Sequence, residues 1–327
     1  YYVLVPKDNF RESLALLTNI ILSPSINPYE FEKEKSVVID EIKQQNDQPD
    51  ENLFNYFLSR VWNDHKYGKT ILGTEKDIQK LKISDLEKFH KNFYNARNCC
   101  ISIAGNLSKK IFEEYYENNL PSINKDKIYN PKNNNESIAI SGTRKETIKF
   151  NGIEFSRILM AWSIPSLKNQ RINIGFEILA SILSVGRNSR LVKVLKEEKN
   201  LVQSIYVDVN GGESGGLLII EACCDEINLQ KVEDEINETI QEVKSYKNLT
   251  LKELSKAINI VKSNYIFNLE TATQITAFFG NELLWGRRNS IKDLNNHLEY
   301  WNNLSNFKEV INYLSRDKFT LIASTIK

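Results

Sequence analysis

The chain has 327 residues, 41% of them hydrophobic and 26% charged, which is enough for a sizeable hydrophobic core and typical of a globular protein with two domains. Lys and Arg number 43 against 42 Asp and Glu, so the net charge is only +1, and no basic segment is interleaved with aromatic residues. These features argue against a nucleic-acid partner.

The beginning of the chain reads like the interior of a domain. Residues 1–6 lack the basic start and the long apolar core of a signal peptide, and their apolar pattern predicts a strand. No apolar run approaches the ~20 residues that a membrane-spanning helix needs, so we expect no membrane span. We also expect the chain to begin inside a domain, which leaves any signal or transit peptide open.

The first part of the chain is predicted to be mainly helical. The segment at residues 27–43 is the clearest helix, because Asn27 is a favourable N-cap, Pro28 suits the first helical position and Glu30 has the spacing of a capping box. The other elements expected here are a strand at 1–5, helices at 9–22 and 51–62, a helix opened by Ser84-x-x-Glu87, a strand at 99–104 and a helix at 111–120.

Two carboxylates occupy positions on the 27–43 helix where an amphipathic helix is usually apolar. Glu34 and Glu41 are seven residues apart, nearly eclipsed at ~100° per residue, and share a stripe with Phe31, Val37 and Val38. We expect both carboxylates to face the interior, where a charged group needs an ion pair, hydrogen bonds or a metal. The alternative is that they lie on the solvated face of a helix rich in Glu and Lys.

A change in composition divides the chain. The segment from Pro121 to Glu136 is rich in Asn, Lys and Pro, which is typical of a linker or surface loop. We therefore predict an N-terminal domain over residues 1–120, a linker over 121–143 and a C-terminal domain over 144–327. The strands expected after the linker lie near 145–150, 157–163, 202–209 and 216–223, and the helices lie near 173–183, 190–199 and 229–244, with a last one capped by Thr250-x-x-Glu253.

The four cysteines form two adjacent pairs, Cys99-Cys100 and Cys223-Cys224, each in a strand-like segment. Neither pair has the C-x-x-C spacing of a zinc or redox site. We interpret them as reduced thiols that fill strands. This favours a reducing compartment such as the cytoplasm or the mitochondrial matrix.

An internal repeat relates the two halves. Leu86 and Phe89 match Phe307 and Val310 at one constant offset, and Ser84 matches the helix cap at residue 305. The same offset aligns the apolar segment at 100–102 with that at 321–323. Each copy ends in a helix, a turn and a strand. We therefore predict an α+β fold of two repeated domains, each a mostly antiparallel sheet covered by helices.

Several short motifs occur in a fixed order along the chain. Glu34-x6-Glu41 lies in the frame Phe-x-x-Glu-Lys-x-Val-Val-x-x-Glu-Ile, and Gly186-x-x-Ser189-Arg190-Leu191 has the form of a Leu-Gly-x-x-x-Ser-Arg-Leu element. Together these motifs resemble the pitrilysin or insulinase-like zinc metallopeptidases, also called inverzincins, and above all the small subunits similar to mitochondrial processing peptidase. The resemblance covers essentially the whole chain. Further matching motifs are Asp47-x-Pro49, Tyr67-Gly68, Ile71-Leu72-Gly73-Thr74 and the segment from Phe93 to Asn98.

The resemblance implies zinc held by an H-x-x-E-H motif and one Glu of a downstream helix, with the Glu inside the motif as general base. By position, Glu41 resembles the third zinc ligand and Glu34 an auxiliary residue that supports the metal site. None of the three histidines of the chain lies in an H-x-x-E-H motif. We therefore assign no catalytic residue within this chain, predict that it is inactive alone, and expect the motif and its general base upstream of Tyr1. The alternative is a degenerate copy.

A second departure from the family concerns substrate binding. Active members carry an Arg and, seven residues later, a Tyr that hold the substrate backbone near the metal, whereas this chain has Lys196 and Gln203 at those positions. Lys keeps the charge but loses the planar fork of Arg, and Gln loses the phenol. In two-subunit members the zinc ligands and the Arg/Tyr pair reside on different chains. The resemblance therefore implies a homologous partner subunit, with a heterodimer favoured and a homodimer possible.

The function that follows from the resemblance is a subunit of a zinc-dependent endopeptidase. Such a subunit cleaves unfolded peptides or presequence-like segments in an enclosed chamber, and the substrate adds as a strand to a sheet edge. Two alternatives stay open: a non-catalytic structural or chaperoning subunit of the same fold, and a plain peptide-binding module. An H-x-x-E-H motif in the upstream sequence would separate the enzyme from both.

Overall fold

The computed structural model describes residues 1–63, 65–95, 98–110, 113–114, 138–246, 249–287 and 290–326. The chain forms two compact units, each built from separate stretches of sequence. We call residues 1–44, 72–134 and 266–288 the helical unit, and residues 45–71, 135–265 and 289–327 the sheet unit. Most of the expected linker, residues 121–137, and most of the expected helix at 111–120 lie outside the described residues. The predicted domain boundaries therefore stay a prediction.

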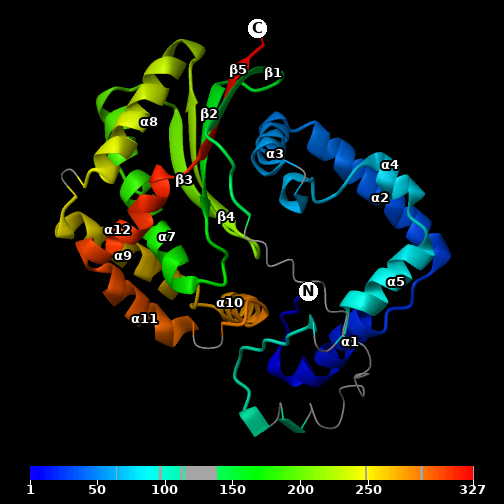
Figure 1. Ribbon diagram of the computed structural model, residues 1–327. Helices are drawn as coiled ribbons and strands as arrows, with labels where there is room; N and C mark the ends of the chain where they lie inside the picture. The colour runs from blue at the N-terminus through cyan, green and yellow to red at the C-terminus, as the bar shows by residue number, and fades with distance from the viewer. Residues whose placement is uncertain are drawn as a thin grey trace. The chain divides into compact units, whose positions relative to one another are not determined.

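A five-stranded sheet organises the sheet unit (Figure 1). Its strands are β1 (Arg144–Phe150), β2 (Ser156–Ile164), β3 (Ser204–Asn210), β4 (Gly216–Cys224) and β5 (Lys318–Thr325), in the order β1-β5-β2-β4-β3. All neighbouring strands are antiparallel except β1 and β5, which are parallel. The mostly antiparallel sheet covered by helices confirms the predicted α+β class, and the last strand is the one that the repeat predicted.

One face of the sheet is covered by helices whose apolar residues form the main core. In β2, Ile158, Met160 and Trp162 are at most 1% exposed and point to this face, as the two-residue period of a strand requires. The helices α7 and α8 lie against it in Figure 1. The helices that contribute to this core are α7 (Gln170–Ser184), α8 (Leu229–Lys244), α9 (Leu251–Phe267), α11 (Ser290–Trp301) and α12 (Leu304–Ile311).

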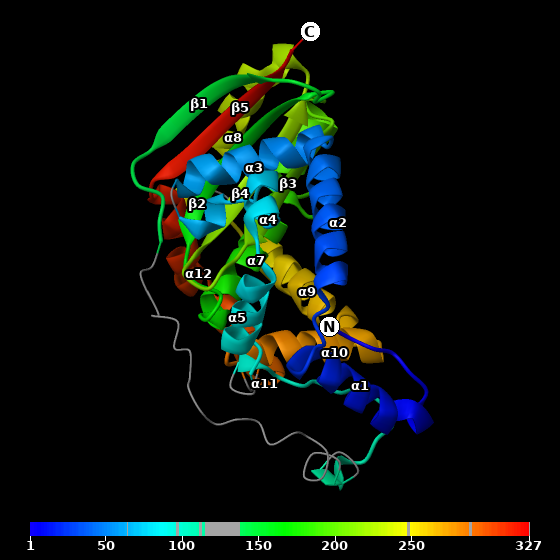
Figure 2. The ribbon, with the colours of Figure 1, turned by 90° about the vertical axis from the view of Figure 1, so that its right-hand side faces the viewer.

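The other face of the sheet carries a single long helix, α3 (Pro49–Trp62), which crosses it in Figure 2. Its residues Leu53, Phe57 and Val61 follow the helical period and are at most 3% exposed. They pack against Leu159 of β2, Phe319 of β5 and their neighbours in a second apolar cluster. The sheet unit is therefore a three-layer arrangement, with helices on both faces of one sheet.

The helical unit contains α1 (Phe10–Leu22), most of α2 (Pro28–Asn46), α4 (Glu75–Lys80), α5 (Ile83–Phe93) and α10 (Ala272–Leu284). The strands predicted at residues 1–5 and 99–104 are wrong, because the described part of this unit contains no strand. An alternating apolar pattern forms a strand only where a neighbour supplies the ladder hydrogen bonds. The apolar side chains of these two segments are also exposed to solvent, since Leu4 is 73% exposed and Ile101 is 42% exposed.

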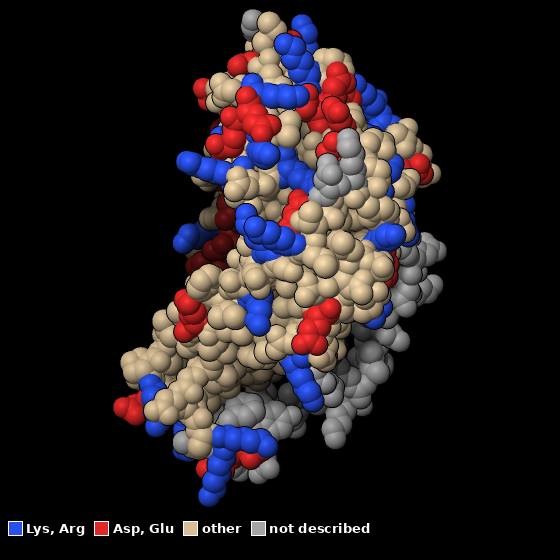
Figure 3. Space-filling view, turned by 90° about the vertical axis from the view of Figure 1, so that its left-hand side faces the viewer, with Lys and Arg blue, Asp and Glu red and all other residues tan. Residues whose placement is uncertain are grey.

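Within the described residues, no helix is both long and apolar enough to cross a bilayer. The molecular face in Figure 3 carries Lys and Arg interspersed with Asp and Glu rather than a stripe of one sign. This mixture agrees with the balanced composition of the chain.

Candidate functional site

The helix that carries the predicted zinc ligand forms as its sequence indicates. Pro28 is the first residue of α2, and the backbone N–H of Tyr29 donates to the side-chain oxygen of Asn27 over 2.8 Å. The N–H of Phe31 donates to the Asn27 carbonyl oxygen over 2.9 Å. These bonds satisfy donors that the first turn of a helix leaves free. The predicted helix and its cap are confirmed.

The carboxylates of Glu34 and Glu41 are both exposed. Glu34 and Glu41 lie on the solvated surface of α2, Val37 of the same stripe is 44% exposed, and Ile42 is the one buried residue of the helix. The expectation that the two carboxylates face the interior is therefore wrong for the described structure. An exposed carboxylate keeps its hydration and needs no partner. The assignment of Glu41 as a metal ligand then rests on its position in the family motif rather than on burial.

The histidines are engaged in packing. His90 places Nε2 2.7 Å from the Ile21 carbonyl oxygen and stacks on Tyr94, with 4.7 Å between ring centroids. His65 meets Tyr67 edge to face at 4.7 Å, and burial, together with the charge of Lys66, lowers the pKa of His65. Burial likewise lowers the pKa of His297. The lowered pKa values of His65 and His297 favour their neutral imidazoles, and the contacts of His65 and His90 are those of packed side chains.

A complete zinc centre does not fit the residues present. Catalytic zinc takes three protein ligands and one open position. No three His, Cys, Asp or Glu side chains come together as a possible metal site within the part of the chain that the structure describes. Glu41 alone offers one carboxylate, so no catalytic step through a metal is derived for this chain.

Lys196 and Gln203 lie within one short segment of the sheet unit. Lys196 belongs to a π-helical turn, η4 (Val192–Glu198), and its side chain is exposed. Gln203 directly precedes β3; its backbone N–H donates to the Cys223 carbonyl oxygen over 2.8 Å, while its side chain is exposed. The backbone of the segment is therefore fixed and both side chains face solvent. Their contact with a substrate peptide stays a prediction.

Sequence reasoning missed an ion pair next to this segment. Nε and Nη2 of Arg190 each donate over 2.8 Å to one oxygen of the Glu253 carboxylate, so that the pair is bidentate. The sequence assigned Arg190 to the Ser-Arg-Leu element and Glu253 to a helix cap. Nothing in the sequence around Arg190 indicates that its partner is Glu253, which lies 63 residues away in the chain.

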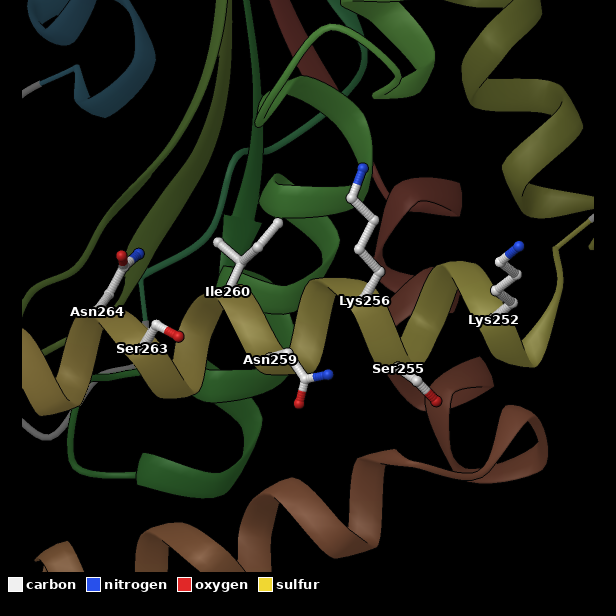
Figure 4. Close-up of a pocket in the computed structure, with 7 residues that line it drawn as sticks. All are labelled: Lys252, Ser255, Lys256, Asn259, Ile260, Ser263 and Asn264. Atoms are coloured by element: carbon white, nitrogen blue, oxygen red, sulfur yellow. The ribbon is translucent and has the colours of Figure 1, made fainter.

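A surface groove of about 510 Å³ runs along α9 (Figure 4). Its lining carries amines, hydroxyls and amides but no His, Cys, Asp or Glu, so that it is no metal site. It includes neither Lys196 nor Gln203. The lining residues are Lys252, Ser255, Lys256, Asn259, Ile260, Ser263 and Asn264.

Comparison with known proteins assigns the chain to a family. The family model described as "Peptidase M16 inactive domain" matches residues 80–261, more than half of the chain, and that described as "Insulinase (Peptidase family M16)" matches residues 1–75. A solved protease from Helicobacter pylori shares the fold, with a TM-score of 0.82 at 21% identity over 98% of this chain and 78% of that one.

Two relatives carry informative names. "Uncharacterized zinc protease YmxG" of Bacillus subtilis (strain 168) is 26% identical over 324 residues, which cover 98% of this chain and 75% of the relative. "Probable mitochondrial-processing peptidase subunit beta" of Schizosaccharomyces pombe is 24% identical over 307 residues, which cover 90% of this chain and 66% of the relative. Zinc is thus the metal of the family. The chain belongs to the insulinase family, peptidase family M16.

Proposed function

We propose that the chain is a subunit of a zinc-dependent endopeptidase that cleaves unfolded peptides or presequence-like segments inside an enclosed chamber. The observation that carries this proposal is the Glu34-x6-Glu41 pair on a well-capped helix within the region that the insulinase model matches. The names of the relatives, zinc protease and processing-peptidase subunit, support the same class of reaction.

In this proposal Glu41 supplies one carboxylate to zinc and Glu34 supports the metal site nearby. When bound, zinc would polarise a peptide carbonyl and activate a water for hydrolysis. The imidazole ligands and the general base belong to an H-x-x-E-H motif that these 327 residues do not contain. The contribution of this chain is therefore one metal ligand, a peptide-contacting surface and an interface to a homologous partner.

A non-catalytic subunit is the second candidate. It is favoured by one observation, which is that Lys196 and Gln203 stand where active members have Arg and Tyr. Such a subunit would bind unfolded peptides through the same exposed segment without contributing a metal ligand. The two candidates differ in whether Glu41 contacts zinc.

The test replaces Glu41 by Gln in the full-length natural protein, co-purified with its homologous partner. We expect zinc content, measured by elemental analysis, and hydrolysis of an unstructured peptide to fall together, because a neutral amide is a poor zinc ligand. Asp40→Asn is the matched control, since Asp40 is the adjacent exposed carboxylate and pairs with Lys43 over 3.1 Å. Unchanged zinc content in the Glu41→Gln protein would favour the non-catalytic candidate.

A further inference from the structure

The segment that carries Lys196 is held at its beginning by two local contacts. The hydroxyl of Ser189 donates to the Gly186 carbonyl oxygen over 2.6 Å, and the N–H of Lys193 donates to the Ser189 carbonyl oxygen over 2.8 Å. Leu191 and Leu195 are fully buried in the main core. Part of the segment is therefore packed in the core, while Lys196, directly after Leu195, is exposed.

The middle of the segment has a widened helical turn. The N–H of Lys199 donates to the Val194 carbonyl oxygen over 3.0 Å, a bond of the π type, and the N–H of Leu201 donates to the Leu195 carbonyl oxygen over 2.8 Å. π-Helical turns are less stable than α-helical ones and occur frequently at functional sites. A turn of this kind needs support from the surrounding structure.

The ion pair between Arg190 and Glu253 contributes to that support. Both side chains are mostly covered, with 13% of Arg190 and 26% of Glu253 exposed, so solvent screens the pair less than it screens a surface pair. The hydrogen bonds of Glu253 raise the pKa of the Arg190 guanidinium. Glu253 is itself fixed, because its N–H donates to the Thr250 hydroxyl over 3.2 Å at the start of α9.

The ion pair between Arg187 and Glu197 in the same segment is a weak contact by comparison. Arg187 lies 4.0 Å from a Glu197 oxygen, and 88% of the Arg187 side chain is exposed. Such a pair contributes little, because solvent screens it and both side chains lose entropy on ordering. Of these two arginines, Arg190 is the one whose geometry ties the segment to another element.

We propose that Arg190 is a positioning residue, whose bidentate pair with Glu253 holds the π-helical segment so that Lys196 and Gln203 present one surface to a peptide. The inference rests on the proposed function for the role of that surface. The pair fixes the start of the segment against the first turn of α9, and the ladder bond from Gln203 to Cys223 fixes its end. Lys196 lies between these two fixed points.

The test compares Arg190→Gln, Arg190→Lys and Glu253→Gln with the control Arg187→Gln in the whole chain. Hydrogen exchange is followed at the amides of Lys199 and Leu201, and affinity for a fluorescent unstructured peptide is measured by anisotropy. We expect exchange at these amides to rise roughly tenfold in Arg190→Gln and Glu253→Gln, because the local opening equilibrium shifts. Peptide affinity should fall by a similar factor, and Arg187→Gln should change neither quantity.

Arg190→Lys and one further double variant distinguish positioning from general stability. Arg190→Lys keeps the charge without the planar fork and should give intermediate values. The exchanged pair, Arg190→Glu with Glu253→Arg, should restore part of the exchange protection if the two side chains act together.

Each outcome decides a separate point. Unchanged exchange at Lys199 and Leu201 in folded Arg190→Gln protein would overturn the anchoring. Raised exchange with unchanged peptide affinity would overturn the positioning role. A wild-type chain that binds no peptide would contradict the proposed function, while the exchange data would still decide the anchoring by Arg190.

Discussion

Cys223 and Cys224 show how one strand gives adjacent residues different surroundings. They are neighbours on β4, so their side chains point to opposite faces of the sheet. Cys224 is fully buried in the main core, and burial, together with the charges of Cys223 and Asp225, raises its pKa to about 12. The Sγ of Cys223 instead lies 2.8 Å from Nη1 of Arg157 on the opposite face. The sequence predicted strand-filling thiols correctly for this pair.

The pair Cys99-Cys100 differs, because both residues are exposed and lie outside any strand. Burial raises the pKa of Cys99, so we expect iodoacetamide at pH 8 to modify Cys100 and to spare Cys224. With a pKa of about 12, only about one Cys224 thiol in 10⁴ is ionised at pH 8, and the thiolate is the reactive form. Because the pKa is raised, the reactivity of Cys224 should increase as the pH rises.

Peptide mass mapping after native alkylation measures this difference, with the urea-unfolded chain as the control in which all four thiols react. Equal modification of Cys100 and Cys224 in the native protein would contradict the described packing.

At the scale of elements, the sequence predicted what local chemistry dictates. The cap at Asn27, the strands of the second half and the helix opened by Thr250 are specified by turn residues and apolar periodicity, and the structure confirms them. The sequence did not predict which elements pair over long distances. The bond between Arg190 and Glu253 and the exposure of Glu41 depend on how helices pack, which periodicity alone does not determine.

The packing of α7 against α11 and α12 depends on Gly175. A Cβ added at this position would lie 2.5 Å from Cγ2 of Val310 and 3.0 Å from the ring of Trp301, both of which are fully buried. We expect Gly175→Ala to lower the free energy of unfolding by roughly 1–3 kcal/mol, because the core must shift to accept the methyl group.

Urea unfolding followed by circular dichroism measures this change. Gly280→Ala on α10 is the matched control, since its nearest neighbour, the Ser102 Cβ, lies at an ordinary 3.4 Å. There the gain in helix propensity should leave stability equal or raise it by up to about 1 kcal/mol. A Gly175→Ala protein as stable as the wild type would contradict the close approach of these helices.

At the scale of the whole molecule, the sequence holds some residues of the family's peptidase motifs and lacks others. It contains the Glu34-x6-Glu41 pair and the segment from Lys196 to Gln203 but no H-x-x-E-H motif. The described residues include no group of three or more possible metal ligands. Division of the site between polypeptides fits a chain whose relatives include a protein named as a subunit.

We therefore expect the isolated 327-residue chain to show no chelator-sensitive hydrolysis of an unstructured peptide. EDTA should also leave its unfolding temperature unchanged, because removing a metal destabilises only a fold that binds one. Calorimetry with and without EDTA, alongside a fluorogenic peptide assay, measures both effects. Chelator-sensitive cleavage by the purified chain would show that a metal site exists where none is expected.

The last prediction concerns how strongly this chain holds a peptide by itself. Lys196 presents a single ammonium where a planar fork would bind two carbonyl oxygens, and Gln203 presents an amide where a phenol would donate. Two additional hydrogen bonds at ~0.5–1.5 kcal/mol each correspond to roughly 5-fold to 150-fold in affinity. Lys196→Arg combined with Gln203→Tyr should therefore tighten binding of an unstructured peptide by about that factor.

Lys193→Arg is the control for this double variant, because Lys193 lies in the same π-helical turn and its side chain is also exposed. It repeats the lysine-to-arginine half of the double variant away from the proposed contact and should leave the affinity unaltered. If the double variant binds the peptide no more tightly than Lys193→Arg, the segment from Lys196 to Gln203 does not contact substrate in this chain. The peptide-binding surface would then have to come from the partner subunit.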